Sequence, residues 1–124
     1  MNKLCISLLF LSNFIICHLS SIDKKTIITP HKKIDIQKVM NYPMDEQIKR
    51  YIKDYKVDYA TAKKHEQELK RWFIIGQELD KSIDMYSSEI DNFWHTLLLY
   101  TKNYAQFCND CFGQFIHHDP KPLT

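Results

Sequence analysis

Apolar side chains recur with the spacing of α-helices over most of the chain after residue 33. A short pattern of this kind covers residues 34–40 and ends at Asn41-Tyr42-Pro43, because a residue before proline avoids helical geometry. The next apolar positions fall at i, i+4, i+7, i+8 and i+11, which predicts an amphipathic helix over residues 44–55: Met44, Ile48, Tyr51, Ile52 and Tyr55.

A longer helix is predicted over residues 59–79, with Asp58 as its N-cap. His65 falls on its apolar stripe, which is typical of a core histidine with one hydrogen bond. Gly76 within the helix indicates the close approach of a neighbouring side chain, for which we expect Trp94. The stripe itself comprises Ala62, Leu69, Trp72, Phe73, Gly76 and Leu79.

The last predicted helix runs over residues 88–112. Ser88 with Asp91 three positions later fits a helix-capping pattern, and Gly113 is suited to end the helix. Neither proline nor glycine interrupts this stretch, so we expect one unbroken helix.

The chain has only two glycines and four prolines, and it shows no strand pattern of convincing length beyond the N-terminal segment. These features predict an all-α fold, a small bundle of three or four helices behind an N-terminal apolar segment. A length of 124 residues suits one domain, which we assign to residues 34–124. The polar residues 22–33 are interrupted by Pro30 and predict a linker.

The first 21 residues predict a secretory signal peptide, because an uncharged apolar run follows Lys3 and ends before small residues. Left uncleaved, the segment would serve as a membrane anchor, and a third interpretation is an apolar helix packed on the domain. Cleavage would make the protein periplasmic or secreted, whereas the alternatives are a cytoplasmic or a membrane-anchored protein. Contact with a membrane is expected only for the uncleaved chain.

The formal net charge of +2 is too small to indicate a nucleic-acid partner. The lysines are spread along the chain beside acidic residues, which is typical of a solvated surface.

Asp91 and His95 are four residues apart on the last predicted helix, so their side chains share one face. A carboxylate beside an imidazole serves a metal ligand, a general base or a capped histidine. His117 and His118 follow Gly113, where the chain can fold back along the helix. The residues are open to two interpretations. In one, the tail packs on the domain, its histidines form hydrogen bonds and no cofactor is bound. In the other, His95 and His117 or His118 bind zinc, with Asp91 hydrogen-bonded behind the ligands.

Cys108 and Cys111 provide an alternative metal site with the tail histidines, or a small disulfide if the protein is exported. On a straight helix Cys108 would lie about 20 Å from His95, too far to share one ion. Cysteines on an apolar helix face are also typical of inert core residues.

One group of motifs is similar to a known family. Its strings are Ile90-Asp91-Asn92-Phe93-Trp94-His95, Tyr100-Thr101-Lys102-Asn103-Tyr104, Phe107-Cys108, Phe112-Gly113, Phe115-Ile116-His117-His118 and Pro120. They resemble the glycine-rich-domain-containing-protein-like family, whose pattern is Asp-x-x-Trp-His, then Thr-x-x-Tyr-x-x-Phe-Cys, then Gly-x-Phe-x-His-His-x-Pro.

The resemblance implies an all-helical domain whose biochemical role is uncharacterised. It is specific over residues 88–120 and looser over the preceding helices. Many members carry a second histidine where this chain has Leu97, and the glycine-rich region of the larger members is absent here.

These patterns suggest two functions. The first is a non-enzymatic helical module that binds an unknown protein or small molecule in a groove beside Trp72 and Trp94. The second is a metal site on His95 with His117 or His118, in one version serving hydrolysis. The chain lacks a glycine-rich phosphate loop, a nucleophile elbow and an H-E-x-x-H motif, so the sequence favours the first.

Overall fold

The computed structural model describes residues 33–120, which form five α-helices and no strand. The helices are α2 (Ile36–Asn41), α3 (Asp45–Tyr55), α4 (Tyr59–Glu78), α5 (Ser88–Leu99) and α6 (Thr101–Phe112). The all-α prediction is confirmed. The predicted signal peptide and nearly all of the predicted linker lie outside the described residues. None of the described helices has the length and apolar character needed to cross a membrane.

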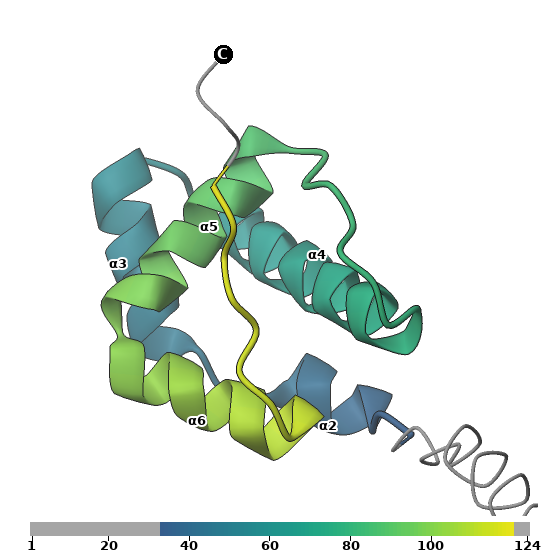
Figure 1. Ribbon diagram of the computed structural model, residues 1–124. Coiled ribbons are helices and arrows are strands. Elements are labelled where there is room, and N and C mark those ends of the chain that lie inside the picture. The colour runs from purple at the N-terminus through teal and green to yellow at the C-terminus, as the bar shows by residue number, and fades with distance from the viewer. Residues whose placement is uncertain (1–32, 121–124) are drawn as a thin grey trace, which may run out of the picture. The chain divides into compact units, whose positions relative to one another are not determined.

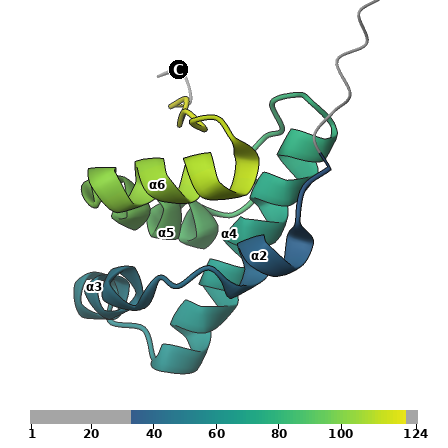
Figure 2. The same cartoon turned by 90° about the horizontal axis from the view of Figure 1, so that it is seen from below.

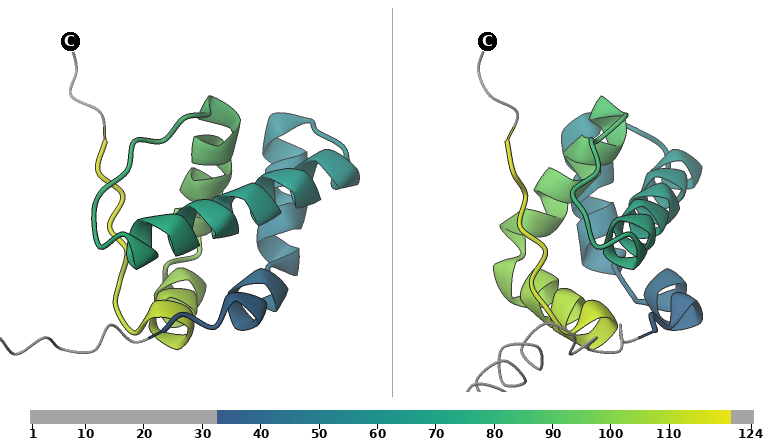
Figure 3. Two further views of the ribbon diagram at one scale, coloured as in Figure 1. Left: turned by 90° about the vertical axis from the view of Figure 1, so that its right-hand side faces the viewer. Right: turned by 45° about the vertical axis from the view of Figure 1, so that its right-hand side comes forward.

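The longest helix, α4, is the element against which α2, α3 and α5 pack (Figure 1). α5 also contacts α3 and α6. The view from below shows α2 lying against α4 (Figure 2). After α6 the chain turns and runs back as an extended segment, drawn in yellow, toward the first turn of α5 (Figures 1 and 3).

Aromatic side chains fill the core between α4, α5 and α6. Phe73 of α4 lies at its centre, with ring centroids 5.1 Å from Trp94 and 5.9 Å from Phe107. Complete burial of one such side chain stabilises the fold by about 1.5–3 kcal/mol. Trp94 is itself only 4% exposed, so most of its indole belongs to this core.

The helix predicted over residues 88–112 is in fact two helices, because the chain bends at Tyr100 between α5 and α6. The prediction of an unbroken helix was wrong, and the division contributes to a count of five helices within residues 33–120, where three or four were expected. A straight helix of that span would extend about 37 Å and carry its second half past the core. The bend lets Phe93 of α5 and Phe107 of α6 be buried in the same core.

Helix α4 confirms its predicted N-cap, since the Asp58 carboxylate accepts a 2.7 Å hydrogen bond from the Thr61 amide. Its last turn differs from the prediction. Leu79, which was expected on the buried stripe, is 53% exposed, and α4 ends one residue earlier, at Glu78. The neighbour of Gly76 is Ile83 of the following loop rather than Trp94: a Cβ atom at Gly76 would lie 3.6 Å from the Ile83 side chain.

Lys70 contradicts the prediction that the lysines form a solvated surface, because its side chain is only 1% exposed. The ammonium group donates hydrogen bonds to the Met40 carbonyl at 3.1 Å, the Tyr42 carbonyl at 2.7 Å and the Glu66 carboxylate at 2.6 Å. Burial lowers the pKa of Lys70, and the neighbouring Glu66 opposes that shift. The two bonds to backbone carbonyls tie the end of α2 to the middle of α4.

Candidate functional site

The start of α5 and the tail after α6 meet at a cluster of one carboxylate and two imidazoles: Asp91, His95 and His118. His118 Nε2 lies 2.8 Å from Asp91 Oδ1, and His95 Nε2 lies 3.4 Å from Asp91 Oδ2. The two imidazole centroids are 4.7 Å apart. One potential ligand atom from each residue lies within 4.8 Å of the other two.

Helix α5 supplies Asp91 and His95 from successive turns. The Ser87 hydroxyl accepts a hydrogen bond from the Ile90 amide and so caps the helix. The predicted cap, Ser88, is instead the first helical residue. Asp91 therefore lies in the first turn, where the helix dipole favours a carboxylate.

The return of the tail begins at Gly113, which ends α6 in the left-handed conformation with φ of 72°. Two hydrogen bonds then fix the tail against the core. The Tyr104 hydroxyl accepts one from Trp94 Nε1 at 3.0 Å and donates one to the Ile116 carbonyl at 2.6 Å. Burial raises the pKa of Tyr104, so the phenol keeps the proton that it donates. We call this pair of hydrogen bonds the Tyr104 clasp. It fixes the backbone at Ile116, two residues before His118, and so holds His118 in position.

The two histidines of the cluster differ in their freedom. The His118 side chain is 14% exposed, and the ring centroids of His118 and Trp94 are 4.3 Å apart. The His95 side chain is 48% exposed. The tail histidine is therefore held in place, whereas His95 has room to adjust its rotamer.

The adjacent tail histidine, His117, lies outside the cluster. Its side chain is exposed and packs edge-on against Phe115 with centroids 4.8 Å apart. The sequence predicted that either or both tail histidines would join His95 and that Asp91 would stand behind them. The structure brings His118 to His95 and presents the Asp91 carboxylate beside both imidazoles as a third potential ligand.

Cys108 and Cys111 are free thiols buried in α6, so the disulfide alternative is not realised. Burial raises the pKa of Cys108 and raises that of Cys111 to about 11. Neither thiol belongs to the candidate ligand cluster found among residues 33–120. The structure therefore gives no support to a cysteine-based metal site.

A pocket of about 550 Å³ opens beside the cluster. Its walls include Trp72, Trp94, Met85 and Pro120, as well as the three cluster residues. The two indoles predicted to flank a binding groove are 5.0 Å apart and both line it. The loop after α4 forms another wall and is joined to Trp72 by a long hydrogen bond from Nε1 to the Asp84 carbonyl, at 3.4 Å.

Two parts of this site were missed by sequence reasoning. The Tyr104 clasp depends on contacts between α5, α6 and the tail, and only the apolar position of Tyr104 on its helix hinted at burial. Met85 lies between α4 and α5, outside every predicted helix. His65, by contrast, behaves as expected: it is half-buried and makes a 2.9 Å hydrogen bond with the Tyr51 hydroxyl.

The distances are compatible with two chemical states. Without a metal, the Asp91 carboxylate forms a 2.8 Å hydrogen bond with His118 Nε2, and His95 Nε2 lies 3.4 Å from its other oxygen. Around a tetrahedral zinc ion with bonds of about 2.0–2.1 Å, neighbouring ligand atoms would lie roughly 3.3 Å apart. His118 Nε2 and His95 Nε2 approach different oxygens of Asp91, at 2.8 and 3.4 Å, so binding one ion requires the ligand atoms to rearrange. The exposed His95 has the freedom to make the remaining adjustment.

Comparison with known proteins identifies one family. A family model described as UCP032817-like matches residues 31–123, three quarters of the chain and all of the cluster. No curated protein and no solved structure is significantly similar to the chain.

Proposed function

The chain belongs to the UCP032817-like family, and we propose that it is a small, non-enzymatic helical module that binds a divalent transition-metal ion. Zinc is the first candidate, because two imidazoles and one carboxylate form a donor set that zinc favours. A single observation carries the proposal: residues from α5 and from the returning tail, 27 positions apart, bring three potential ligand atoms within 4.8 Å.

The surroundings of the cluster favour a binding site over an incidental surface group. The Tyr104 clasp fixes the backbone at Ile116, and the Trp94 indole packs against the His118 ring. Such preorganisation lowers the entropic cost of bringing the ligands together when the ion binds. The pocket beside the cluster provides room for an organic partner that completes the coordination sphere.

The relation to the glycine-rich-domain-containing-protein-like family remains a prediction. Its Asp-x-x-Trp-His string contains Asp91, Trp94 and His95, and its His-His-x-Pro string contains His118. Both strings thus contribute to the proposed site.

The decisive test is zinc titration of the full chain, purified without a histidine tag, by isothermal calorimetry. His95→Ala should weaken zinc binding by about 100-fold or more, because it removes one of three ligands. His95 is half exposed, so this substitution leaves the fold intact. The matched control is His117→Ala, which removes a histidine from the same tail outside the cluster and should change the affinity by less than about twofold. Equal zinc affinity in the wild type, His95→Ala and His117→Ala would contradict the proposal.

A second candidate function is metal-dependent hydrolysis. It is favoured by one observation: the cluster offers three ligands and lies beside a pocket, as in catalytic zinc sites that keep a position for water. The zinc-loaded chain would then cleave an activated ester such as 4-nitrophenyl acetate in a reaction lost in His95→Ala and retained in His117→Ala. An identical rate in the wild type and His95→Ala would exclude this role.

A further inference from the structure

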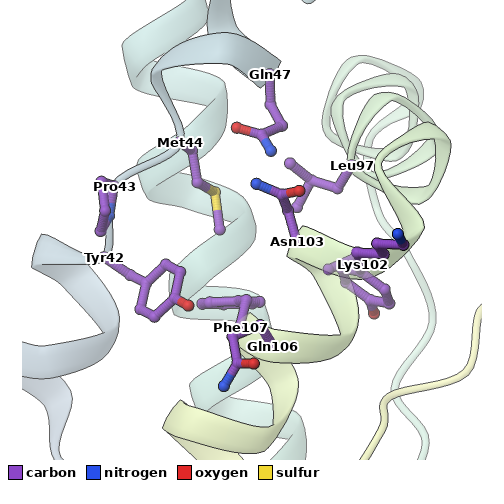
Figure 4. Close-up of a pocket in the computed structure, with 10 residues that line it drawn as sticks. Tyr42, Pro43, Met44, Gln47, Leu97, Lys102, Asn103, Gln106 and Phe107 are labelled. Carbon is purple, nitrogen blue, oxygen red and sulfur yellow. The ribbon is translucent and has the colours of Figure 1, made fainter.

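A second pocket, of about 350 Å³, lies where α3, α5 and α6 meet (Figure 4). None of the residues that line it lines the pocket beside Asp91, His95 and His118. A ligand bound here would therefore occupy a separate pocket, and Tyr104, which also lines it, links it to the tail that carries His118.

The most buried polar side chain of this pocket is Gln47 on α3. Gln47 is only 6% exposed, and its side chain makes no hydrogen bond within residues 33–120. In Figure 4 the amide points into the pocket, toward the amide of Asn103 on α6. The amide is not sealed from solvent, because among the described residues Glu66 Oε2 is the one buried side-chain N/O atom without a hydrogen-bond partner. Its hydrogen-bonding groups therefore face the pocket and are open to a ligand. Gln47 thus offers a donor and an acceptor that a bound molecule would satisfy.

The remainder of the pocket is largely apolar. Met44, Leu97 and Phe107 lie around the two amides and are themselves almost completely buried (Figure 4). The Tyr42 hydroxyl, which also faces this region, is already engaged in a 3.0 Å hydrogen bond to Asp110. Gln106, which also lines the pocket, donates a 2.7 Å hydrogen bond to Asp110. Polar recognition of an uncharged ligand therefore falls mainly to Gln47 and Asn103.

We propose that this pocket binds a small, uncharged, planar heterocycle whose edge carries an N–H donor next to a carbonyl acceptor, as in a lactam or imide. The ring would pack against Met44 and Phe107, and its edge would pair with the Gln47 and Asn103 amides. Lys102 is the one cationic residue lining the pocket, and the chain carries a net charge of only +2. A free small molecule therefore fits better than a base within a nucleic acid, which requires a track of cations.

The test is an NMR titration of the full chain, labelled with ¹⁵N, using uracil as the probe and 1,3-dimethyluracil as its matched control. The control keeps the ring and the carbonyls but has both N–H donors blocked. Uracil should shift the side-chain amide signals of Gln47 and Asn103 and saturate with a Kd of about 1–10 mM, as expected for so small a ligand. The dimethyl compound should bind at least about tenfold more weakly, because its edge leaves the Gln47 amide unpaired.

Variants locate the site. Asn103 is exposed, so Asn103→Leu should leave the fold intact and weaken uracil binding by about fivefold or more. Asn109→Leu is the control, because Asn109 is an exposed asparagine of the same helix that does not line the pocket. The absence of saturable shifts at the Gln47 and Asn103 amides, equal affinity for the two compounds, or equal loss in the two variants would overturn the proposal.

Discussion

Two sets of reactive side chains lie in the last third of the chain, and the fold treats them in opposite ways. Asp91, His95 and His118 meet beside a pocket, and the His95 ring is half exposed. Cys108 and Cys111 are also one turn apart on a helix, but their thiols are buried and their pKa values are raised by burial. Both sets contain residue types that bind metals.

The difference lies in which face of the helix each set occupies. The cluster lies on the face of α5 toward the returning tail, whereas the cysteines lie on the face of α6 toward the core. Residue type and spacing therefore did not distinguish a candidate site from an inert pair. The two sets are distinguished by their access to solvent and by the return of the tail, which brings His118 to Asp91.

The largest expected effect is on thiol reactivity. In the native protein at pH 8, Cys108 and Cys111 should react with iodoacetamide about 100-fold or more slowly than in the unfolded chain, because they react only after local opening. Peptide mapping by mass spectrometry measures each site separately, which matters because the chain carries four cysteines. Native rates within about threefold of the unfolded rates would contradict the difference in access between the two sets.

The Tyr104 clasp links the two regions, and its loss should have an intermediate effect. Tyr104→Phe leaves the Trp94 N–H and the Ile116 carbonyl without their partner and should lower the free energy of unfolding by about 1–3 kcal/mol. It should also release the tail, seen as a change in the NMR signals of the His118 ring. The matched control is Tyr100→Phe, which removes only a long 3.5 Å hydrogen bond to Glu46 and should cost less than about 0.5 kcal/mol. Equal costs for the two variants would show that the clasp does not hold the tail.

The smallest expected effect is a decrease in the free energy of unfolding as the pH rises above about 9. The pKa of Cys111 is raised from 9.0 to about 11 in the folded chain, so the folded state holds a proton that the unfolded state releases. Its contribution to stability is fully present below about pH 9 and is lost as the pH rises toward 11. Chemical denaturation at intervals from pH 8 to 11 should show this decline, less steeply in Cys111→Ala. An unchanged slope in the variant would exclude Cys111 as its source.

Much of the fold could be predicted from local patterns. The apolar stripe of α3 and the Asp58 cap of α4 are recorded in neighbouring residues, because helical spacing and capping involve positions close in sequence. The bend at Tyr100 could not be predicted in this way. It has neither proline nor glycine to mark it and exists because both halves bury aromatic side chains in one core.

The same limit applies to the buried Lys70 and to the site. Lys70 carries a charge that is usually exposed, and its burial depends on Glu66 in the same helix and on the carbonyls of Met40 and Tyr42, about thirty residues away. The sequence identified Asp91, His95 and the histidine pair as candidate site residues, since their types and spacing are local. Which tail histidine would reach His95 depended on the Tyr104 clasp, a contact between segments that are distant in sequence.

The central claim is that Asp91, His95 and His118 together bind a metal ion. Anomalous diffraction at the zinc edge, from crystals grown with zinc, tests it most directly. The predicted result is a peak within about 2.0–2.2 Å of an imidazole nitrogen of His95, an imidazole nitrogen of His118 and a carboxylate oxygen of Asp91. A peak at Cys108 and Cys111, or no peak at the cluster, would contradict the claim.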